Sequence, residues 1–211
     1  MTDIKTIAFV TCTWGRPHIS AIYRDKLLAL QDEFFDYKFI NIVVDSDYSN
    51  RGVFGKEFNY INYANKPLSN KWNFAIKQLE GKSFDYAILM GSDDTMDRVV
   101  LSKIDSLIKS NDWVGVLDIY FKRYKSSSVI YWPGYDGNRK GEPIGAGRAL
   151  SSDLIKELGY KLFDDGLNRG LDYSLYKKIQ AKKKATFKCK DIGGVLMDIK
   201  SDTNITKLKY V

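Results

Sequence analysis

Apolar, β-branched runs alternate with helix-like segments through the first half of the sequence, and this alternation restricts the fold more than any other feature. The runs predict strands over residues 7–12, 39–44, 58–63 and 86–90. Apolar residues at helical spacing predict helices over residues 19–30, 68–79 and 97–110. Such alternation forms βαβ units, so we expect an α/β fold with a mainly parallel central sheet flanked by helices.

The second half is less regular. Strands are predicted over residues 113–121 and 128–132, as a hairpin, and over 186–188 and 195–199. A glycine-rich stretch precedes two predicted helices over residues 151–159 and 172–182. We find no internal repeat, linker or low-complexity region, so the sequence predicts a single domain over residues 1–211.

Composition excludes several classes of protein. Hydrophobic residues make up 44% of the chain, enough for a packed core, which excludes a disordered chain. Two cysteines, Cys12 and Cys189, and one histidine, His18, argue against a disulfide framework and a Cys/His zinc site. No apolar stretch approaches the ~18 residues of a membrane span, and the N-terminal apolar run is too short for a secretory signal. We therefore expect a soluble, cytoplasmic protein.

The net charge of +7 is concentrated in one segment. The segment from Lys177 to Lys190 contains seven lysines and no acidic residue, so the rest of the chain is formally neutral. It is either a solvated helix face or a patch for a polyanion such as nucleic acid or anionic lipid head groups. No dedicated DNA-binding motif accompanies it.

Three polar loops follow predicted strands: TWGRP, DSDYSN and GSDDTM. Ligands of parallel sheets bind beyond the carboxyl ends of the strands, so all three loops point to one crevice. The adjacent carboxylates Asp93 and Asp94 suit Mg²⁺ or Mn²⁺ shared with substrate phosphates. In the alternative interpretation, Asp94 or Thr95 only caps the helix that follows.

The segments FVTCTWGRP, VVDSDYSN, LSNKWN and LMGSDD are followed later by GLDYSLYKKI. In this order and spacing they resemble the motifs of nucleotide-sugar glycosyltransferases of the GT-A fold, most of all the inverting enzymes of family 2. The resemblance runs from about Ile7 to Lys178. It implies a Rossmann-like nucleotide-binding half, residues 1–97, and an acceptor-side half, residues 98–211. The chain departs from the family pattern at Gly91 and Leu171, where relatives have Asp and Glu, and at Lys71, where they have Arg.

The resemblance also implies roles for the matching residues on the donor side. Thr11 and Arg16 would line the base pocket, and Asp45 would accept from the base or ribose, with Asp47 as its competitor. Asn70, Lys71 and Asn73 would approach the nucleotide or sugar, and Lys71 would offset phosphate charge. Asp93 would contact the ribose or sugar, and Asp94 would hold Mn²⁺ or Mg²⁺.

On the acceptor side, the resemblance makes Asp172 the general base that takes the proton of the acceptor hydroxyl. The alternatives are that Asp172 is only a helix cap, or that Asp164 or Asp165 is the base. Separately, Gly145 and Gly147 allow the backbone to approach a ligand, and Arg148 could meet a phosphate. A tight turn is the alternative interpretation of this stretch.

The resulting hypothesis is a metal-dependent, inverting glycosyltransferase that moves a sugar from a nucleoside-diphosphate sugar, with UDP-sugars expected, to an acceptor hydroxyl. The acceptor stays open between a glycan, a lipid-linked sugar, a protein and, because of the lysine segment, a hydroxymethylated DNA base as in some phage enzymes. A nucleotidyltransferase that makes a nucleotide-sugar is the first alternative, although TWGRP has one glycine where a phosphate loop is glycine-rich. A non-catalytic nucleic-acid or glycan binder is the second.

Overall fold

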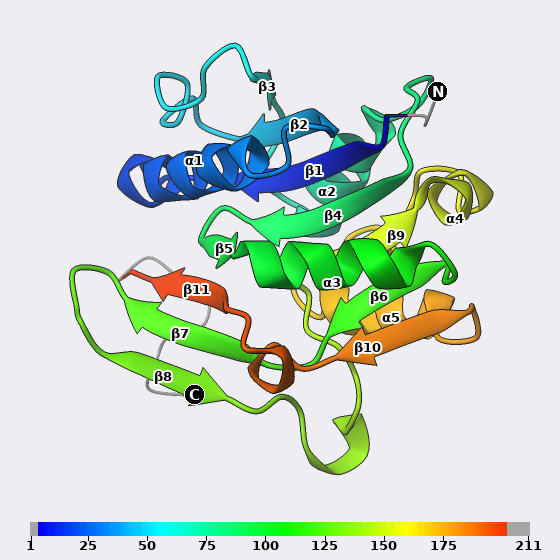
Figure 1. Cartoon of the computed structure of the whole chain (residues 1–211). Helices are drawn as coiled ribbons and strands as arrows, with labels where there is room; N and C mark the ends of the chain where they lie inside the picture. The colour runs from blue at the N-terminus through cyan, green and yellow to red at the C-terminus, as the bar shows by residue number, and fades with distance from the viewer. Residues whose placement is uncertain (1–3, 202–211) are drawn as a thin grey trace.

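The computed structural model describes residues 4–201, which form two sheets (Figure 1). The larger sheet has seven strands in the order β10-β6-β9-β4-β1-β2-β3. Their bounds are β1 (Thr6–Thr13), β2 (Lys38–Asp45), β3 (Phe58–Asn62), β4 (Tyr86–Gly91), β6 (Trp113–Val116), β9 (Arg148–Ser151) and β10 (Lys184–Phe187). Six strands share one direction and only β9 is antiparallel to its neighbours, which confirms the mainly parallel sheet.

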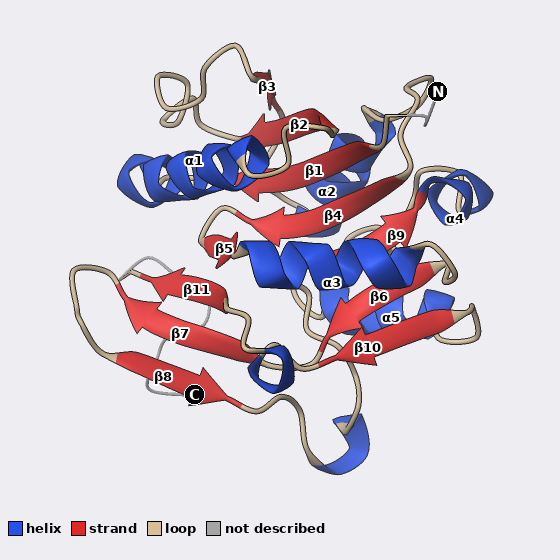
Figure 2. Ribbon diagram, viewed as in Figure 1, coloured by secondary structure: helices blue, strands red, loops and turns tan. Residues whose placement is uncertain are grey.

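Helices cover both faces of this sheet (Figure 2). Helices α1 (Pro17–Asp32) and α3 (Arg98–Ile108) pack on one face, and α2 (Leu68–Lys77), α4 (Ser152–Glu157) and α5 (Leu171–Ile179) on the other. Strand β1 contributes Ile7 and Phe9 to the first core and Ala8 and Val10 to the second. A strand buried on both faces reads as a continuous apolar run, which is why the sequence revealed it.

The smaller sheet lies beside the carboxyl end of β4 and has the order β5-β11-β7-β8. Its strands are β5 (Asp94–Met96), β7 (Ile119–Arg123), β8 (Val129–Trp132) and β11 (Leu196–Lys200). Strand β11 runs antiparallel to β5 and parallel to β7, and β7–β8 is the predicted hairpin. Two 3₁₀ turns, η1 (Gly137–Arg139) and η2 (Lys190–Ile192), complete the described elements.

The strand predicted over residues 113–121 is two strands in two different sheets, β6 and β7. The chain changes sheet next to Asp118, which is fully buried. Its carboxylate accepts the backbone N–H groups of Cys189 at 2.6 Å and Lys190 at 3.1 Å. An apolar run carries no signal for such a bend, because the bend is fixed by residues about 70 positions away.

The structure excludes two of the alternative interpretations. The stretch around Arg148, for which a tight turn was the alternative, contains strand β9, in which Ala149 pairs with Ile88 on one side and Val114 on the other. The cap of α3 is Asp97, whose carboxylate accepts the Val100 N–H at 3.0 Å, and not Asp94 or Thr95. Asp94 therefore has no capping role and instead begins β5.

Candidate active site

Three carboxylates from two separate parts of the chain meet at the carboxyl end of β4. Asp93 and Asp94 follow β4 directly, and Asp198 lies in β11. Ligand atoms of all three lie within 4.8 Å of one another. The register of β5 and β11 explains this, because Asp94 and Asp198 are paired residues of the two antiparallel strands, which places their side chains side by side.

The charges of this group are only partly balanced by neighbouring cations. Arg16 donates to Asp93 at 2.9 Å and to the Ser92 hydroxyl at 3.2 Å, and Lys200 donates to Asp198. Within residues 4–201, Asp94 accepts a hydrogen bond only from the Gly91 N–H, at 2.7 Å. In the same part of the chain, two side-chain cations, Arg16 and Lys200, therefore face three carboxylates.

Burial, reinforced by Asp198 and Asp93, raises the pKa of Asp94 well above its ordinary value. Burial and then Asp93 raise the pKa of Asp198 to about 7. One oxygen of Asp198 is buried and has no hydrogen-bond partner within residues 4–201. Close, mutually repelling carboxylates with a spare oxygen are the donor set that a hard divalent cation prefers, so these residues fit Mg²⁺ or Mn²⁺.

Steric contacts explain why position 91 is occupied by glycine. A Cβ at Gly91 would lie 2.7 Å from an Asp94 oxygen and 2.9 Å from an Asp93 oxygen. No real side chain tolerates contacts of this length, so an aspartate at this position would displace both carboxylates. Glycine at position 91 therefore leaves Asp93 and Asp94 where they meet Asp198.

The carboxylates line a cavity of about 490 Å³ that also contains an arginine–aspartate pair. Its wall includes the side chains of Arg148 and Asp172, and aromatic rings from Trp72, Trp132 and Tyr135. Such a volume accommodates a small organic ligand. The structure therefore brings four of the predicted residues, Asp93, Asp94, Arg148 and Asp172, to one cavity, which Arg16 approaches through Asp93.

Arg148 is fully buried and holds the backbone around Asp172. Its guanidinium donates to the carbonyl oxygens of Asp172 at 3.1 Å, Pro143 at 2.8 Å and Ile144 at 3.1 Å. Its Nε has no partner within the described residues. Because all three of these acceptors are main-chain carbonyls, the arginine fixes the position of the backbone around Asp172.

Asp172 lies in the first turn of α5. Burial raises the pKa of its carboxyl, against the opposing effects of Arg148 and Arg139. A Cβ at Gly145 would lie 2.1 Å from an Asp172 oxygen, so only glycine allows this approach. A carboxylate whose pKa is raised is a stronger base than an ordinary aspartate, which suits it to accept a proton.

Thr11, Asp45 and Lys71 do not line this cavity. Thr11 is fully buried, and its hydroxyl bonds that of Tyr23 at 2.5 Å. Asp45 is also fully buried and accepts from Asn50 and Tyr60. Lys71 is 1% exposed and donates to the Thr13 carbonyl at 2.5 Å, and burial lowers its pKa. These side chains stabilise the ends of β1 and β2.

Asp47, the competitor of Asp45, is exposed on the loop after β2 and accepts from the Ser49 hydroxyl at 2.7 Å. Asn70 and Asn73 bind a neighbouring loop: Asn70 accepts the Gly166 N–H at 3.1 Å, and Asn73 exchanges two hydrogen bonds with the backbone of Phe163 at 2.9 Å. In this structure the two asparagines therefore hold, by hydrogen bonds, the loop beside the cavity that contains Phe163 and Gly166.

The two alternative bases lie outside the cavity. Asp164 pairs with Lys178 at 2.9 Å, and this bond, with one from Ser174, lowers the pKa of Asp164. Asp165 pairs with Lys161 at 2.5 Å on the surface. Because neither carboxylate lines the cavity, Asp172 is the best-placed base among the three.

The lysine segment is spread over a helix and an edge strand. Lys178 and Lys182 pair with Asp164 and Glu157. Three others, Lys177, Lys184 and Lys190, lie over aromatic rings. Strand β10 forms an edge of the large sheet, where lysines commonly prevent edge-to-edge pairing. This arrangement gives a structural reason for the lysines; a nucleic-acid partner stays a prediction.

Sequence reasoning missed Asp198 and Lys200. A signal was present, because the apolar strand LMDIK carries two charged residues two positions apart, which places both on one face. Their meeting with Asp94 depends on pairing between residues about 100 positions apart, which the sequence does not show.

Comparisons with known proteins give structural matches only. No family model and no curated protein matches the sequence. The structure is similar to a crystal structure of 4-diphosphocytidyl-2C-methyl-D-erythritol synthase from Anaerococcus prevotii DSM 20548, with a TM-score of 0.58 and 12% identity over 98% of this chain and 92% of that one. The chain has a GT-A and nucleotidyltransferase-like fold. This confirms the predicted fold class, and the fold is shared by transferases.

A second similar structure is that of S. aureus TarS 1-349, with a TM-score of 0.56 and 12% identity. The match covers 93% of this chain and 60% of that one, so this chain spans somewhat over half of the TarS fragment. At this identity the likeness describes the fold. No helix within residues 4–201 is long and apolar enough to cross a membrane.

Proposed function

We propose that this protein transfers a sugar from a nucleoside-diphosphate sugar, with UDP-sugars as the expected donors, to an acceptor hydroxyl. The observation that carries the proposal is that one cavity is lined both by the carboxylates Asp93, Asp94 and Asp198 and by the buried base candidate Asp172. A diphosphate leaving group needs positive charge, and an acceptor hydroxyl needs a proton acceptor. The cavity supplies residues for both.

Asp94, Asp198 and Asp93 are the residues that would hold Mn²⁺ or Mg²⁺. The bound cation would neutralise charge on the diphosphate as it leaves. Arg16 adds a fixed positive charge beside Asp93. Lys200 is buried next to Asp198, and the ion pair between them orients the Asp198 carboxylate.

Asp172 would take the proton from the acceptor hydroxyl as the new glycosidic bond forms. Its raised pKa strengthens it as a base, and the Arg148 hydrogen bonds keep its backbone fixed while the proton moves. Trp72, Trp132 and Tyr135 offer ring faces to a sugar and reduce the water around the reacting atoms. Direct displacement with the base opposite the leaving group gives inversion.

The test is release of a nucleoside diphosphate from UDP- and GDP-sugars with Mn²⁺ or Mg²⁺, before and after EDTA. Asp172→Asn is expected to lower kcat roughly 1000-fold while nucleotide binding is retained. Asp165→Asn, a surface carboxylate of the same kind, is the control and should change nothing. Absence of diphosphate from every donor, with or without metal, would refute the proposal.

One observation supports a second candidate, a nucleotidyltransferase. The similar synthase, whose name describes a product containing a cytidine diphosphate group, aligns with 98% of this chain. Such an enzyme would release pyrophosphate from a nucleoside triphosphate and would not need Asp172 to deprotonate an acceptor hydroxyl. Pyrophosphate release that survives Asp172→Asn would therefore replace the first proposal with this one.

A further inference from the structure

The small sheet separates two cavities of nearly equal size. One is the acidic cavity described above, and the other has a volume of about 480 Å³. Residues of the small sheet alternate between them: Asp198 and Lys200 of β11 face the first, and Met197 and Ile199 face the second. The second cavity, which we call the rear cavity, lies between this sheet and α1. It plays no part in the proposed reaction.

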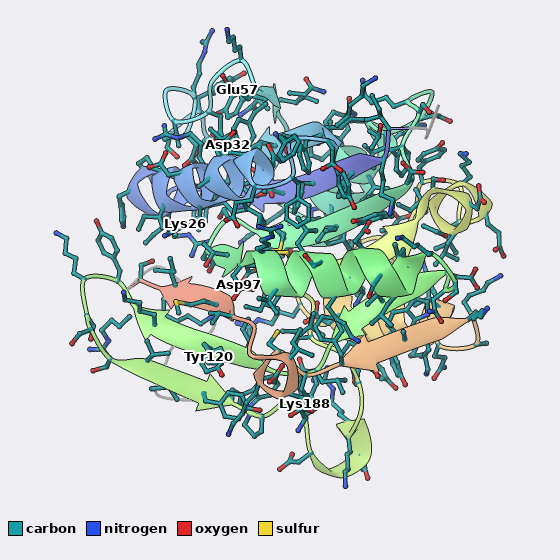
Figure 3. All side chains as sticks on the ribbon, in the orientation of Figure 1. Lys26, Asp32, Glu57, Asp97, Tyr120 and Lys188 are labelled. Atoms are coloured by element: carbon teal, nitrogen blue, oxygen red, sulfur yellow. The ribbon has the colours of Figure 1, made fainter. Side chains whose placement is uncertain are left out.

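The rear cavity combines an apolar floor with a cationic rim. Ile22, Met96, Val195, Met197 and Ile199 line the floor. The cations are Lys26 from α1, Lys122 and Arg123 from β7, and Lys125 from the loop that follows β7. Figure 3 shows Lys26 on the side of α1 that faces the small sheet, with Asp97 nearby at the beginning of α3.

The four rim cations are uncompensated. Among residues 4–201, none of the four forms an ion pair with a carboxylate within 4.0 Å, in contrast to Lys178 and Lys182. Of the lining residues within 4–201, Asp97 is the one acid, and it is already bonded to the backbone N–H groups of Val100 and Val195. Four cations around an apolar floor select a ligand that is anionic at one end and apolar at the other.

We propose that the rear cavity binds an anionic phospholipid and thereby attaches the protein to an anionic membrane surface. The phosphate would meet Lys122, Arg123 and Lys125, and the first part of an acyl chain would cover Met197 and Ile199. Basic residues near a membrane each add to the attraction of anionic lipid, and buried apolar area adds to it. The chain's own residues 202–211 include two lysines and one aspartate, so their charge does not complement this rim.

The lining favours lipid over nucleic acid. Single-stranded nucleic acid is bound by basic grooves with exposed aromatic platforms. Among the described residues, Tyr124 is the one aromatic side chain that lines the rear cavity; it is half-buried and lies against His18, with 4.8 Å between ring centroids. The floor instead consists of aliphatic and thioether side chains, which suit a hydrocarbon chain.

The test is flotation of the full-length protein with vesicles of phosphatidylcholine alone or of equal parts phosphatidylcholine and phosphatidylglycerol. Binding is expected only to the anionic vesicles and should weaken as salt rises. The double variant Lys122→Gln/Lys125→Gln should bind them roughly 30-fold more weakly. The control Lys177→Gln/Lys183→Gln removes the same charge from α5 and from the loop before β10, neither of which lines the rear cavity, and should bind normally.

Two further measurements distinguish the outcomes. Short-chain, soluble phosphatidylglycerol should compete with the vesicles, whereas inorganic phosphate at the same concentration should not, because it lacks the apolar part. Equal weakening in both double variants, or full competition by phosphate, would overturn the lipid site. Tighter binding to duplex DNA, lost in the Lys122/Lys125 variant, would also overturn it. Diphosphate release in solution should be unchanged in that variant, so the lipid site and the proposed reaction fail independently.

Discussion

A buried aspartate lies near each end of the central strands, and the two aspartates differ in the partners that surround them. Near the amino end of β1, Asp105 of α3 is bonded to Lys5 at 2.6 Å and to the hydroxyls of Tyr37 and Tyr86 at 3.1 Å. At the carboxyl end of β4, Asp94 has one backbone N–H and two neighbouring carboxylates. The first aspartate has cationic and hydroxyl partners within the protein, whereas the second lies among like charges, as expected of a cation ligand.

This contrast separates structural acids from functional ones without any knowledge of relatives. A buried charge that is fully paired stabilises a particular packing, and its removal leaves unpaired partners. A buried charge among like charges destabilises the empty protein and is retained only if something else depends on it. The predictions below compare the two ends directly.

The largest expected effect is on turnover. Asp94→Asn should reduce nucleoside-diphosphate release by about 1000-fold, because it removes charge where the leaving group must be neutralised. Asp105→Asn, measured on the folded fraction, should retain activity within a few-fold. Steady-state rates with saturating Mn²⁺ test this. If Asp105→Asn lost activity and Asp94→Asn did not, the functional aspartate would be Asp105 and the proposed role of Asp94 would be wrong.

The second effect is on the pH dependence of stability. The pKa of Asp198 is raised to about 7 in the folded protein, so the folded state binds the proton more tightly than the unfolded state. Stability is therefore greatest below the ordinary carboxyl pKa and falls as pH rises through about 7. Without metal, the melting temperature should fall by up to about 10 °C across this window.

Added Mn²⁺ should restore the melting temperature most at the high-pH end, where the carboxylates are ionised. Asp198→Asn should flatten the pH dependence and reduce the stabilisation by Mn²⁺. Differential scanning fluorimetry in EDTA and in Mn²⁺ measures both effects. A metal-independent melting temperature at every pH would contradict the assignment of the carboxylates.

The third effect is on stability alone. Asp105→Asn should lower the free energy of unfolding by about 3 kcal/mol, because Lys5 loses its buried partner. Asp94→Asn in EDTA should leave it unchanged or higher. Urea denaturation measures both, with the exposed Asp32→Asn as the control, for which at most about 0.5 kcal/mol is expected. Equal destabilisation by the first two variants would remove the distinction.

The smallest effect concerns the base. Arg139 opposes the raised pKa of Asp172, and Arg139 itself is bonded to Glu142. Arg139→Gln should move the acidic limb of the kcat profile to higher pH by less than about 1 unit, since Asp172 must be ionised to act. Arg169→Gln, which removes the same charge from an exposed residue outside the cavity lining, should leave the limb in place. An unmoved limb in Arg139→Gln would argue against Asp172 as the base.

The sequence was informative where one short segment determines the outcome. The two-faced apolar strands β1, β2 and β4 and the helices between them were predicted because burial on both faces leaves a local pattern. Asp93, Asp94 and Asp172 were identified because they follow or begin such elements. Strand β9 was missed because RALS, with Arg148 at its start, has no alternation and is stabilised by neighbours on both sides.

The rest of the site depends on contacts across the chain. The third carboxylate, Asp198, joins the site only because the register of β11 with β5 places it beside Asp94. Asn70 and Asn73 were assigned to the donor, whereas the structure uses them to hold a loop about 90 residues away. A polar side chain at a helix start looks the same in sequence whether it contacts a ligand or the backbone.

The late position of β11 makes the large sheet and the acidic group separable in the sequence. All seven strands of the large sheet end before Lys188, whereas Asp198 and Lys200 follow it. A chain truncated after Lys188 would contain every strand of that sheet yet lack the third carboxylate. Such a truncation would show whether the sheet folds without the strand that completes the acidic group.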